Sequence, residues 1–245
     1  MCCSDKNESG DVCAIRPIAR IHTDFKEKFG VPRQTGLVPE LRARIEFEPE
    51  YRCIDAIRGL ENFNYIWLIF GFSKNRREDG SWSPLVRPPR LGGKIKVGVF
   101  ATRSPFRPNS LGLSSVPLLD IDRSDPANPA LIVGGADLLD GTPIYDIKPY
   151  ARYADCHTDA LKGFMVENRE FLNVEIPDEL LEKIEPDKRE ALKGVLAQDP
   201  RAPYEKEPDN VFGMRFAGYD VRFTVDQKNI LRVTGILPAD AENVK

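Results

Sequence analysis

The feature that most constrains the fold is a series of short apolar segments, separated by loops rich in proline and glycine, over the first 155 of the 245 residues. Segments of this kind favour an all-β barrel or sandwich over βαβ units. Only one stretch in this region, Pro49–Leu60, has apolar residues at helical spacing, which predicts a single short helix. The predicted strands are Ile15–His22, Ala43–Phe47, Tyr65–Phe72, Lys96–Thr102, Leu113–Ile121, Leu131–Asp137 and Pro143–Pro149.

The pattern changes near residue 155. Two charge-rich segments with helical apolar spacing follow, Ala160–Val174 and Pro177–Gln198, and Pro186 is expected to divide the second of them. Strands are predicted over Asp209–Phe216 and in a closing hairpin, Tyr219–Val225 with Ile230–Ile236. We therefore expect a mainly β domain at residues 14–155 and a small α+β domain at residues 156–240.

Composition excludes several classes of protein. No apolar run approaches the roughly 20 residues that a membrane-spanning helix needs. No Gly-x-Gly-x-x-Gly follows a predicted strand, so a Rossmann nucleotide site is not supported. The five cysteines have no Cys-x-x-Cys spacing and the chain has only two histidines, which predicts neither a metal site nor a disulfide framework and favours the reducing cytoplasm.

Charge is unevenly distributed along the chain, although the net charge is only −3. From Lys74 to Arg107 there are nine basic and two acidic residues, whereas Asp155–Asp209 holds 15 acidic and eight basic ones. This asymmetry indicates two functional units, of which the first faces a polyanion. The pI near 5.6 argues against a dedicated nucleic-acid domain, but a local basic patch is sufficient to attract phosphates.

The segment Gly98–Asn109 combines two arginines, Arg103 and Arg107, with two prolines, Pro105 and Pro108. Proline restricts its own backbone and that of the residue before it, so the loop is predicted to be preorganised. Arginine presents five donors in a fixed plane and keeps its charge. The segment therefore predicts a rigid receptor for anionic or planar groups, with a solvated surface turn as the alternative.

Five motifs in this order carry a family resemblance: Val31–Gln34, Trp82–Gly93, Gly98–Asn109, Gly112–Ser114 and Asp137–Tyr150. Through them the chain resembles the TrmO (TsaA-like) family of S-adenosylmethionine-dependent tRNA methyltransferases, over residues 14 to 155. The resemblance implies a compact β-barrel, unlike Rossmann or knotted methyltransferases, and a homodimer. It also implies methylation of N6 of N6-threonylcarbamoyladenosine at position 37, in the tRNA anticodon loop.

The resemblance also implies which residues contact the cofactor S-adenosylmethionine. This chain has Ser73 where the family has a histidine, so contacts from the backbone are the ones expected to remain at that loop. The expected cofactor-contacting residues are Pro32, Arg33, Gln34, Ser73, Lys74, Arg103, Leu113, Asp140, Gly141, Thr142 and Pro143.

The chemistry of the donor and of methyl transfer suits these residue types. Arg33 or Arg103 is a candidate to clamp the donor's carboxylate, and Asp140 to accept from its ribose hydroxyls or amine. Gly141 allows a close backbone approach, although Asp-Gly-Thr-Pro is also an ordinary turn sequence. Asp140 or Asp146 is the candidate proton acceptor for the weakly nucleophilic N6.

Further residues are candidates for contact with the acceptor. Arg103 or Arg107 is expected to stabilise negative charge that spreads onto the ureido oxygen, and Asn109 to hydrogen-bond the base edge. The threonyl carboxylate needs a cation, for which Arg107 and Lys148 are candidates.

RNA is expected to bind the basic loop Lys74–Lys96, where Trp82 is a candidate to stack on a splayed base. The alternative for Trp82 is a hydrophobic plug in a long loop. Two other functions stay open from the sequence. One is a non-catalytic RNA-binding barrel, and the other is a methyltransferase of the same fold with a different acceptor.

Overall fold

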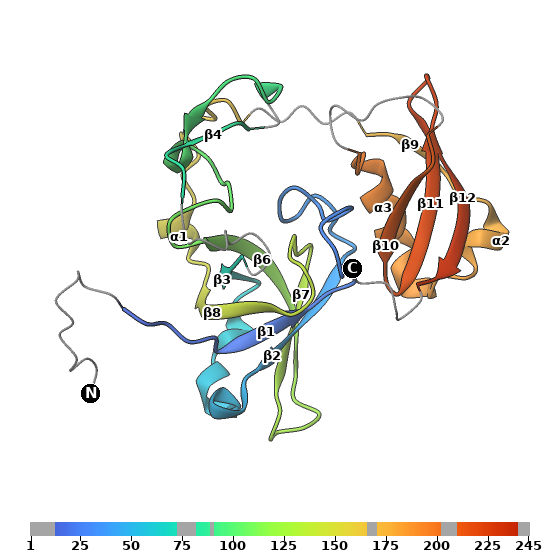
Figure 1. Cartoon of the computed structure of the whole chain (residues 1–245). Helices are drawn as coiled ribbons and strands as arrows, with labels where there is room; N and C mark the ends of the chain where they lie inside the picture. The colour runs from blue at the N-terminus through green and yellow to red at the C-terminus, as the bar shows by residue number, and fades with distance from the viewer. Residues whose placement is uncertain (1–12, 73–81, 89–90, 166–170, 202–209, 240–245) are drawn as a thin grey trace.

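The computed structural model describes residues 13–72, 82–88, 91–165, 171–201 and 210–239. Six strands close into a barrel in the order β1-β2-β7-β6-β3-β8 (Figure 1), and every neighbouring pair is antiparallel. The prediction of a mainly β fold built on a barrel is confirmed. The strands are β1 (Ala19–His22), β2 (Arg42–Phe47), β3 (Tyr65–Gly71), β6 (Leu111–Asp122), β7 (Ala130–Gly134) and β8 (Thr142–Pro149).

Apolar residues alternate with polar ones along the strands, and the apolar side chains fill the interior of the barrel. In β2, Ala43, Ile45 and Phe47 are buried while the residues between them are at least partly exposed. Closure depends on the long strand β6, which pairs with β3 through its first half and with β7 through its second half. Its register shifts between Leu118 and Asp120. A bulge of this kind bends a strand and increases its twist, which lets one strand serve both sides of a closed sheet.

A second sheet lies in the C-terminal part, in the order β10-β11-β12-β9, with β9 parallel to β12. Helix α3 (Arg189–Ala197) buries Ala191, Leu192, Val195 and Leu196 in the same apolar cluster as this sheet. Pro186 begins a short 3₁₀ turn, η6 (Pro186–Lys188), between α2 (Asp178–Leu181) and α3, as predicted. The strands are β9 (Asn173–Glu175), β10 (Phe212–Phe216), β11 (Tyr219–Val225) and β12 (Ile230–Pro238).

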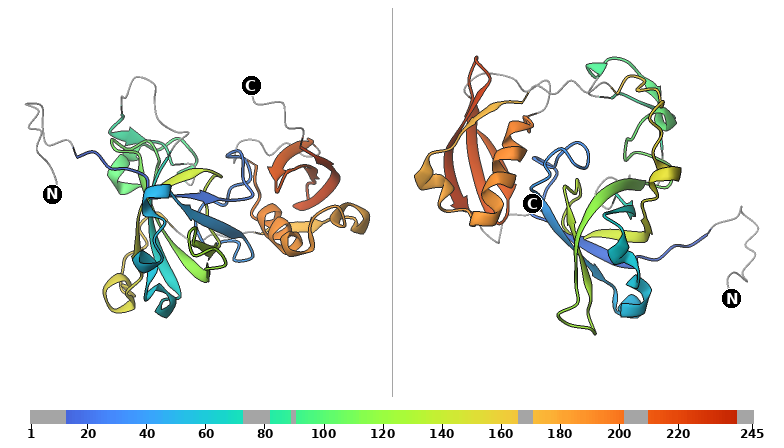
Figure 2. Two further views of the ribbon diagram at one scale, coloured as in Figure 1. Left: turned by 90° about the horizontal axis from the view of Figure 1, so that it is seen from below. Right: turned by 180° about the vertical axis from the view of Figure 1, so that it is seen from behind.

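The loop between β1 and β2 belongs to the second core. Its residues Phe25, Val38 and Leu41 are buried among the apolar residues of α3 and the second sheet. The rings of Phe25 and Phe216 meet edge-to-face with centroids 5.6 Å apart. Both views in Figure 2 show this blue loop between the barrel and the C-terminal sheet. The loop therefore connects the two cores.

Three predicted elements differ from the structure. Lys96–Thr102 forms only a two-residue strand, β5 (Val97–Gly98), which pairs with β4 (Leu85–Val86) and is followed by the 3₁₀ turn η5 (Val99–Ala101). Beyond Gly98 the apolar run leaves the strand, and its side chains divide between the interior and the surface, since Val99 is buried and Phe100 is 70% exposed.

The helix predicted over Pro49–Leu60 is also wrong. Three short 3₁₀ turns lie there instead: η1 (Pro49–Tyr51), η2 (Ile54–Ile57) and η3 (Leu60–Asn62). The apolar residues of these turns still pack on the barrel core, with Ile57 buried, so a helix is not needed for these contacts.

No helix covers the described part of Ala160–Val174, where Asn173 and Val174 pair with β12 as part of β9. Ladder hydrogen bonds at the edge of the second sheet outweigh the helical pattern there. A one-turn helix, α1 (Arg152–Asp155), precedes this stretch. Among the helices that the structure describes, none is both long and apolar enough to cross a membrane.

Candidate active site at one mouth of the barrel

The barrel topology places three loops at the same mouth. At this mouth β1, β3 and β7 end and β2, β6 and β8 begin, so its rim is formed by residues 23–41, by residues 135–141 and by the described parts of the connection between β3 and β6, namely 72, 82–88 and 91–110. In Figure 1 these loops lie on the upper side of the barrel, and the connections at 48–64 and 123–129 lie on the lower side. The motif residues fall in the rim loops or at the first residues of the adjoining strands, except for those in the second half of β8.

Hydrogen bonds join the first loop to the third. The Gly36 amide donates to the Gly135 carbonyl at 2.9 Å. Thr35 Oγ1 donates to Asp137 Oδ1 at 2.6 Å, and the same oxygen accepts from Ser114 Oγ on β6 at 3.1 Å. Ser114 is 3% exposed. The Asp137 carboxylate, on the third rim loop, thus contacts both the first rim loop and strand β6.

The long loop 72–110 reaches β6 through Arg103. Its Nη2 donates to the carbonyl of Leu113 at 3.1 Å, so two predicted cofactor-contacting residues are adjacent. The amide of Phe72, at the end of β3, donates to Ser110 at 3.0 Å. Ser73 and Lys74, which follow Phe72, lie outside the described residues.

Arg107 is held inside this loop. Its Nη1 donates to the carbonyl of Thr102 at 2.8 Å and to that of Val99 at 3.4 Å, and its guanidinium lies 5.8 Å from the centroid of the Phe100 ring. Bonds to two carbonyls stabilise the turn, as expected for a preorganised segment. Asn109, two residues further on, is exposed.

Asp140 is fixed by the first loop. Its Oδ1 accepts from the Thr23 amide at 3.2 Å and lies 3.3 Å from His22 Nδ1, while Oδ2 pairs with Lys26. Partial burial acts to raise the pKa of Asp140, but the bonds from Lys26 and Thr23 and the charge of Lys26 outweigh it, so the pKa lies below its usual range. The carboxylate is therefore ionised at neutral pH.

The side chain of Asp140 faces a cavity of about 460 Å³ between the barrel and the second domain. His22, Lys26, Arg42 and Lys188 also line it. Acidic residues balance these cations, because Asp24, Glu40 and Asp187 lie in the same lining. Gln34, Leu113 and Asp137 are not among the described residues that line this cavity.

The turn after Asp140 leaves its backbone accessible. Gly141 has φ +74°, and a Cβ added there would meet no atom within 4 Å. The Gly141 amide donates to Ile21 at 2.8 Å, and Thr142 Oγ1 donates to Leu139 at 2.7 Å. Thr142 is buried and Pro143 half-buried at the start of β8. The open space beside Gly141 suits a ligand that approaches the backbone closely.

The remaining predicted residues differ in their accessibility. In the first loop Pro32 is buried, Gln34 half-buried and Arg33 exposed. Asp146 lies four residues beyond Thr142 along β8, where its Oδ1 accepts from the Ile147 amide at 2.9 Å. Its other contact is with Lys148, at 3.6 Å. None of these contacts joins Asp146 or Lys148 to the rim loops.

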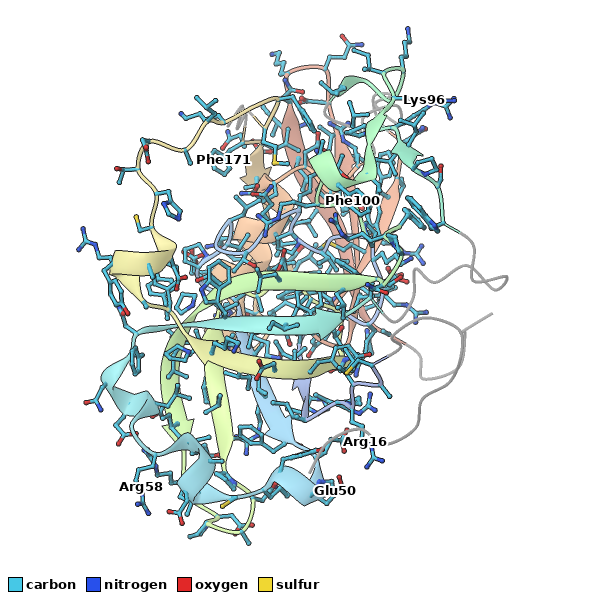
Figure 3. All side chains as sticks on the ribbon, turned by 90° about the vertical axis from the view of Figure 1, so that its left-hand side faces the viewer. Arg16, Glu50, Arg58, Lys96, Phe100 and Phe171 are labelled. Atoms are coloured by element: carbon cyan, nitrogen blue, oxygen red, sulfur yellow. The ribbon has the colours of Figure 1, made fainter. Side chains whose placement is uncertain are left out.

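Aromatic and basic side chains lie together on the long loop. Trp82 is 45% exposed, and its ring centroid lies 6.0 Å from that of Phe100. Lys94 and Lys96 are exposed nearby in the sequence. Figure 3 shows Lys96 and Phe100 on the opposite side of the barrel strands from Glu50 and Arg58.

Sequence reasoning missed two features of this mouth, the hydrogen bonds of Asp137 and the exposure of Phe100. Asp137 carried a recognisable signal, because it stands between the apolar residues Ala136 and Leu138, and a carboxylate among buried neighbours requires partners. Phe100 carried none, since its apolar run was indistinguishable from a buried strand.

Two family models match the chain. The model of the tRNA-methyltransferase O N-terminal domain matches residues 20–156, and that of the TrmO C-terminal domain matches residues 169–239. The chain belongs to the TrmO family. A tRNA (adenine(37)-N6)-methyltransferase from Escherichia coli K12 is 40% identical over 217 residues, which cover 85% of this chain and 91% of the relative.

Other TrmO relatives match nearly the whole chain. A putative S-adenosylmethionine-dependent methyltransferase from Pseudomonas aeruginosa PAO1 is 36% identical over 235 residues, covering 93% of this chain and 99% of the relative. A crystal structure of TrmO from Pseudomonas aeruginosa has a TM-score of 0.74 at 32% identity, covering 92% of this chain and 99% of that one. These matches confirm the family resemblance that the five motifs predicted.

Proposed function

We propose that this TrmO protein transfers a methyl group from S-adenosylmethionine to N6 of N6-threonylcarbamoyladenosine at position 37 of tRNA. The observation that carries the proposal is the arrangement of the motif-bearing loops around one barrel mouth, where Asp137 joins the third loop to Thr35 on the first loop and to Ser114 on β6. Similarity to tRNA (adenine(37)-N6)-methyltransferases supports the reaction class. The two proposed domains are residues 14–155, which hold the site, and 156–240.

The described residues suit the methyl donor. Its adenosine and amino-acid parts carry hydroxyl, amine and carboxylate groups, and the rim offers both guanidinium groups and backbone donors and acceptors. Arg33 and Arg103 are the proposed partners of the carboxylate. Gly141, with open space at its Cα, is the proposed point of close backbone contact. When bound, the sulfonium supplies an activated methyl group for in-line displacement.

The protein's part in the transfer is to align donor and acceptor and to receive a proton from N6. Asp140 is ionised at neutral pH, but its pairing with Lys26 must loosen before it accepts that proton. Asp146 is the second candidate and lies further from the rim loops. Arg107 and Asn109 are proposed to contact the acceptor, with Arg107 stabilising charge on the ureido oxygen.

The anticodon loop is proposed to dock on the exposed aromatic pair Trp82 and Phe100. Aromatic side chains stack on splayed bases, and the exposed cations Arg87, Lys94 and Lys96 suit the phosphates. The many exposed apolar side chains of this loop also suit the homodimer that the family resemblance implies. We place the enzyme in the cytoplasm, where its tRNA substrate is found.

Methylation of purified tRNA tests this proposal. The protein is incubated with S-adenosylmethionine and with tRNA that either carries or lacks threonylcarbamoyladenosine, and nucleosides are analysed by mass spectrometry. Product is expected only with the modified tRNA. Methylation of tRNA that lacks the modification, or of neither tRNA, contradicts the proposed acceptor.

Two variants test the proton acceptor. Asp140→Asn is expected to lower kcat by about 10²-fold or more at saturating donor, whereas Asp146→Asn keeps kcat within a few-fold if it lies outside the reacting centre. Unchanged kcat in both variants excludes a carboxylate base. Calorimetry with S-adenosylmethionine distinguishes a non-catalytic RNA-binding barrel from the two methyltransferase functions. The RNA-binding barrel is expected not to bind S-adenosylmethionine, whereas either methyltransferase is expected to bind it.

A further inference from the structure

The carboxylate of Asp137 lies where three elements of the barrel mouth meet. Its Oδ1 accepts one hydrogen bond from Thr35 on the β1–β2 loop, at 2.6 Å, and another from Ser114 on β6, at 3.1 Å. Asp137 itself belongs to the β7–β8 loop. Its neighbours Ala136 and Leu138 are 3% and 4% exposed, so the backbone around the carboxylate is fixed by packing.

The residues that Asp137 contacts are next in sequence to residues proposed to hold the methyl donor. Thr35 follows Gln34, and Ser114 follows Leu113. A backbone contact reinforces the first of these connections. Gly36 donates to Gly135 at 2.9 Å, and a Cβ at Gly135 would approach the Gly36 backbone to 3.1 Å. The distance between the two loops is therefore fixed at two consecutive residues, Thr35 and Gly36, which directly follow Gln34.

We propose that Asp137 is a positioning residue, which sets the spacing of Gln34, Leu113 and the Asp140 turn and so preorganises the site for S-adenosylmethionine. The inference rests on the proposed function. A carboxylate oxygen is suited to this task because it can accept hydrogen bonds from two hydroxyl donors at once. Without these bonds the three segments remain folded on the barrel but lose their fixed separation.

Preorganisation has a measurable signature. A site whose parts must be ordered when the ligand arrives binds that ligand more weakly, even though every contacting residue is present. Once the donor is bound, the segments reach the same arrangement as in the wild type. The loss therefore falls on donor affinity and on the KM for the donor, and kcat at saturating donor changes little.

The test uses the full-length protein and S-adenosylmethionine itself as the probe. Asp137→Ala and Thr35→Val are each expected to raise the Kd measured by calorimetry, and the KM for the donor, about tenfold, with kcat within about twofold. Thr35→Ser restores the hydroxyl and is expected to return the Kd to within about twofold of the wild-type value. Thr234→Val is the matched control, since it removes a hydroxyl bond of 3.3 Å to Arg222 on the second sheet.

A double-mutant cycle sharpens the result. Because Thr35 and Asp137 form one contact, the double variant is expected to bind the donor about as weakly as either single variant. A Kd that stays at the wild-type value in Thr35→Val, or one that Thr35→Ser fails to restore, overturns the inference. If Asp137→Ala fails to fold, the comparison of Thr35→Val with Thr35→Ser decides the test alone. A wild-type protein that binds no S-adenosylmethionine refutes the proposed function itself.

Discussion

Truncation of Phe216 to alanine is predicted to weaken donor binding although Phe216 lies in the second domain. Phe216 is fully buried, and its ring meets that of Phe25 at 5.6 Å. Phe25 precedes the segment Pro32–Gln34 in the same loop. Replacing a buried phenylalanine with alanine costs about 3–5 kcal/mol of unfolding free energy, and the pairwise contribution of two aromatic rings is about 0.5–1.5 kcal/mol.

The coupling is measured by a cycle of Phe25→Ala, Phe216→Ala and the double variant, each unfolded in urea and followed by circular dichroism. A coupling energy of about 0.5–1.5 kcal/mol is expected. Donor affinity is then measured on the folded single variants by calorimetry. We expect Phe216→Ala to raise the Kd about two- to tenfold, because the loop that carries Gln34 loses a fixed anchor.

Phe223→Ala is the matched control. Phe223 is also fully buried in the second core, but its ring stacks on Phe212 at 5.7 Å and not on the β1–β2 loop. It is expected to lose similar stability and to keep donor affinity. Equal loss of affinity in Phe223→Ala and Phe216→Ala, or a coupling energy of zero, would refute the reasoning.

Three further predictions concern single positions. Gly112→Ala should cost about 1–3 kcal/mol in a urea titration, because its Cβ would lie 2.3 Å from the ring of Phe70, and an unchanged midpoint would contradict this packing. Asp140 has a depressed folded-state pKa, so its stabilising contribution is present above the ordinary aspartate pKa and is lost as pH falls through the folded value. Thermal melts at pH 3 to 7 should therefore show a smaller pH dependence for Asp140→Asn than for the wild type. Phe100→Ala should raise the KM for tRNA several-fold while the Kd for S-adenosylmethionine stays constant, since Phe100 is 70% exposed and is assigned to RNA; a selective loss of donor binding would contradict that assignment.

Much of the architecture followed from the sequence because its signals are local. Six of the seven barrel-region strands were predictable, since alternation and turn residues report burial of one face. The interruption at Pro186 was also predictable from a local signal, because proline has no backbone N–H to donate and its ring clashes with the preceding helical turn. The helix expected at Pro49–Leu60 is wrong although its apolar residues do pack on the barrel core, with Ile57 buried and Tyr51, Ile54 and Leu60 partly buried, because three short 3₁₀ turns make the same contacts.

The loops of the candidate site were predictable from their motifs, but the contacts between these loops were not. Turn chemistry and arginine-rich segments identified the loops, while the barrel closure that brings them to one mouth depends on pairings between strands distant in sequence. The partner of Asp137 on β6, Ser114, is 23 residues away, and that of Asp140 on the first loop, Lys26, is 114 residues away. Contacts between residues so far apart in sequence produce no periodic pattern of residue types from which they could be predicted.

The opposite mouth of the barrel offers an attachment point for labels and affinity tags. The connection between β6 and β7 turns at Asp125–Asn128, where Asp125 accepts from the Ala127 amide, and it extends away from the motif-bearing loops (Figure 1). A fluorophore or an affinity peptide attached at this turn would leave the motif-bearing loops uncovered in a tRNA-binding assay. The same geometry would let the protein be immobilised in a uniform orientation, with the motif-bearing loops directed toward solution.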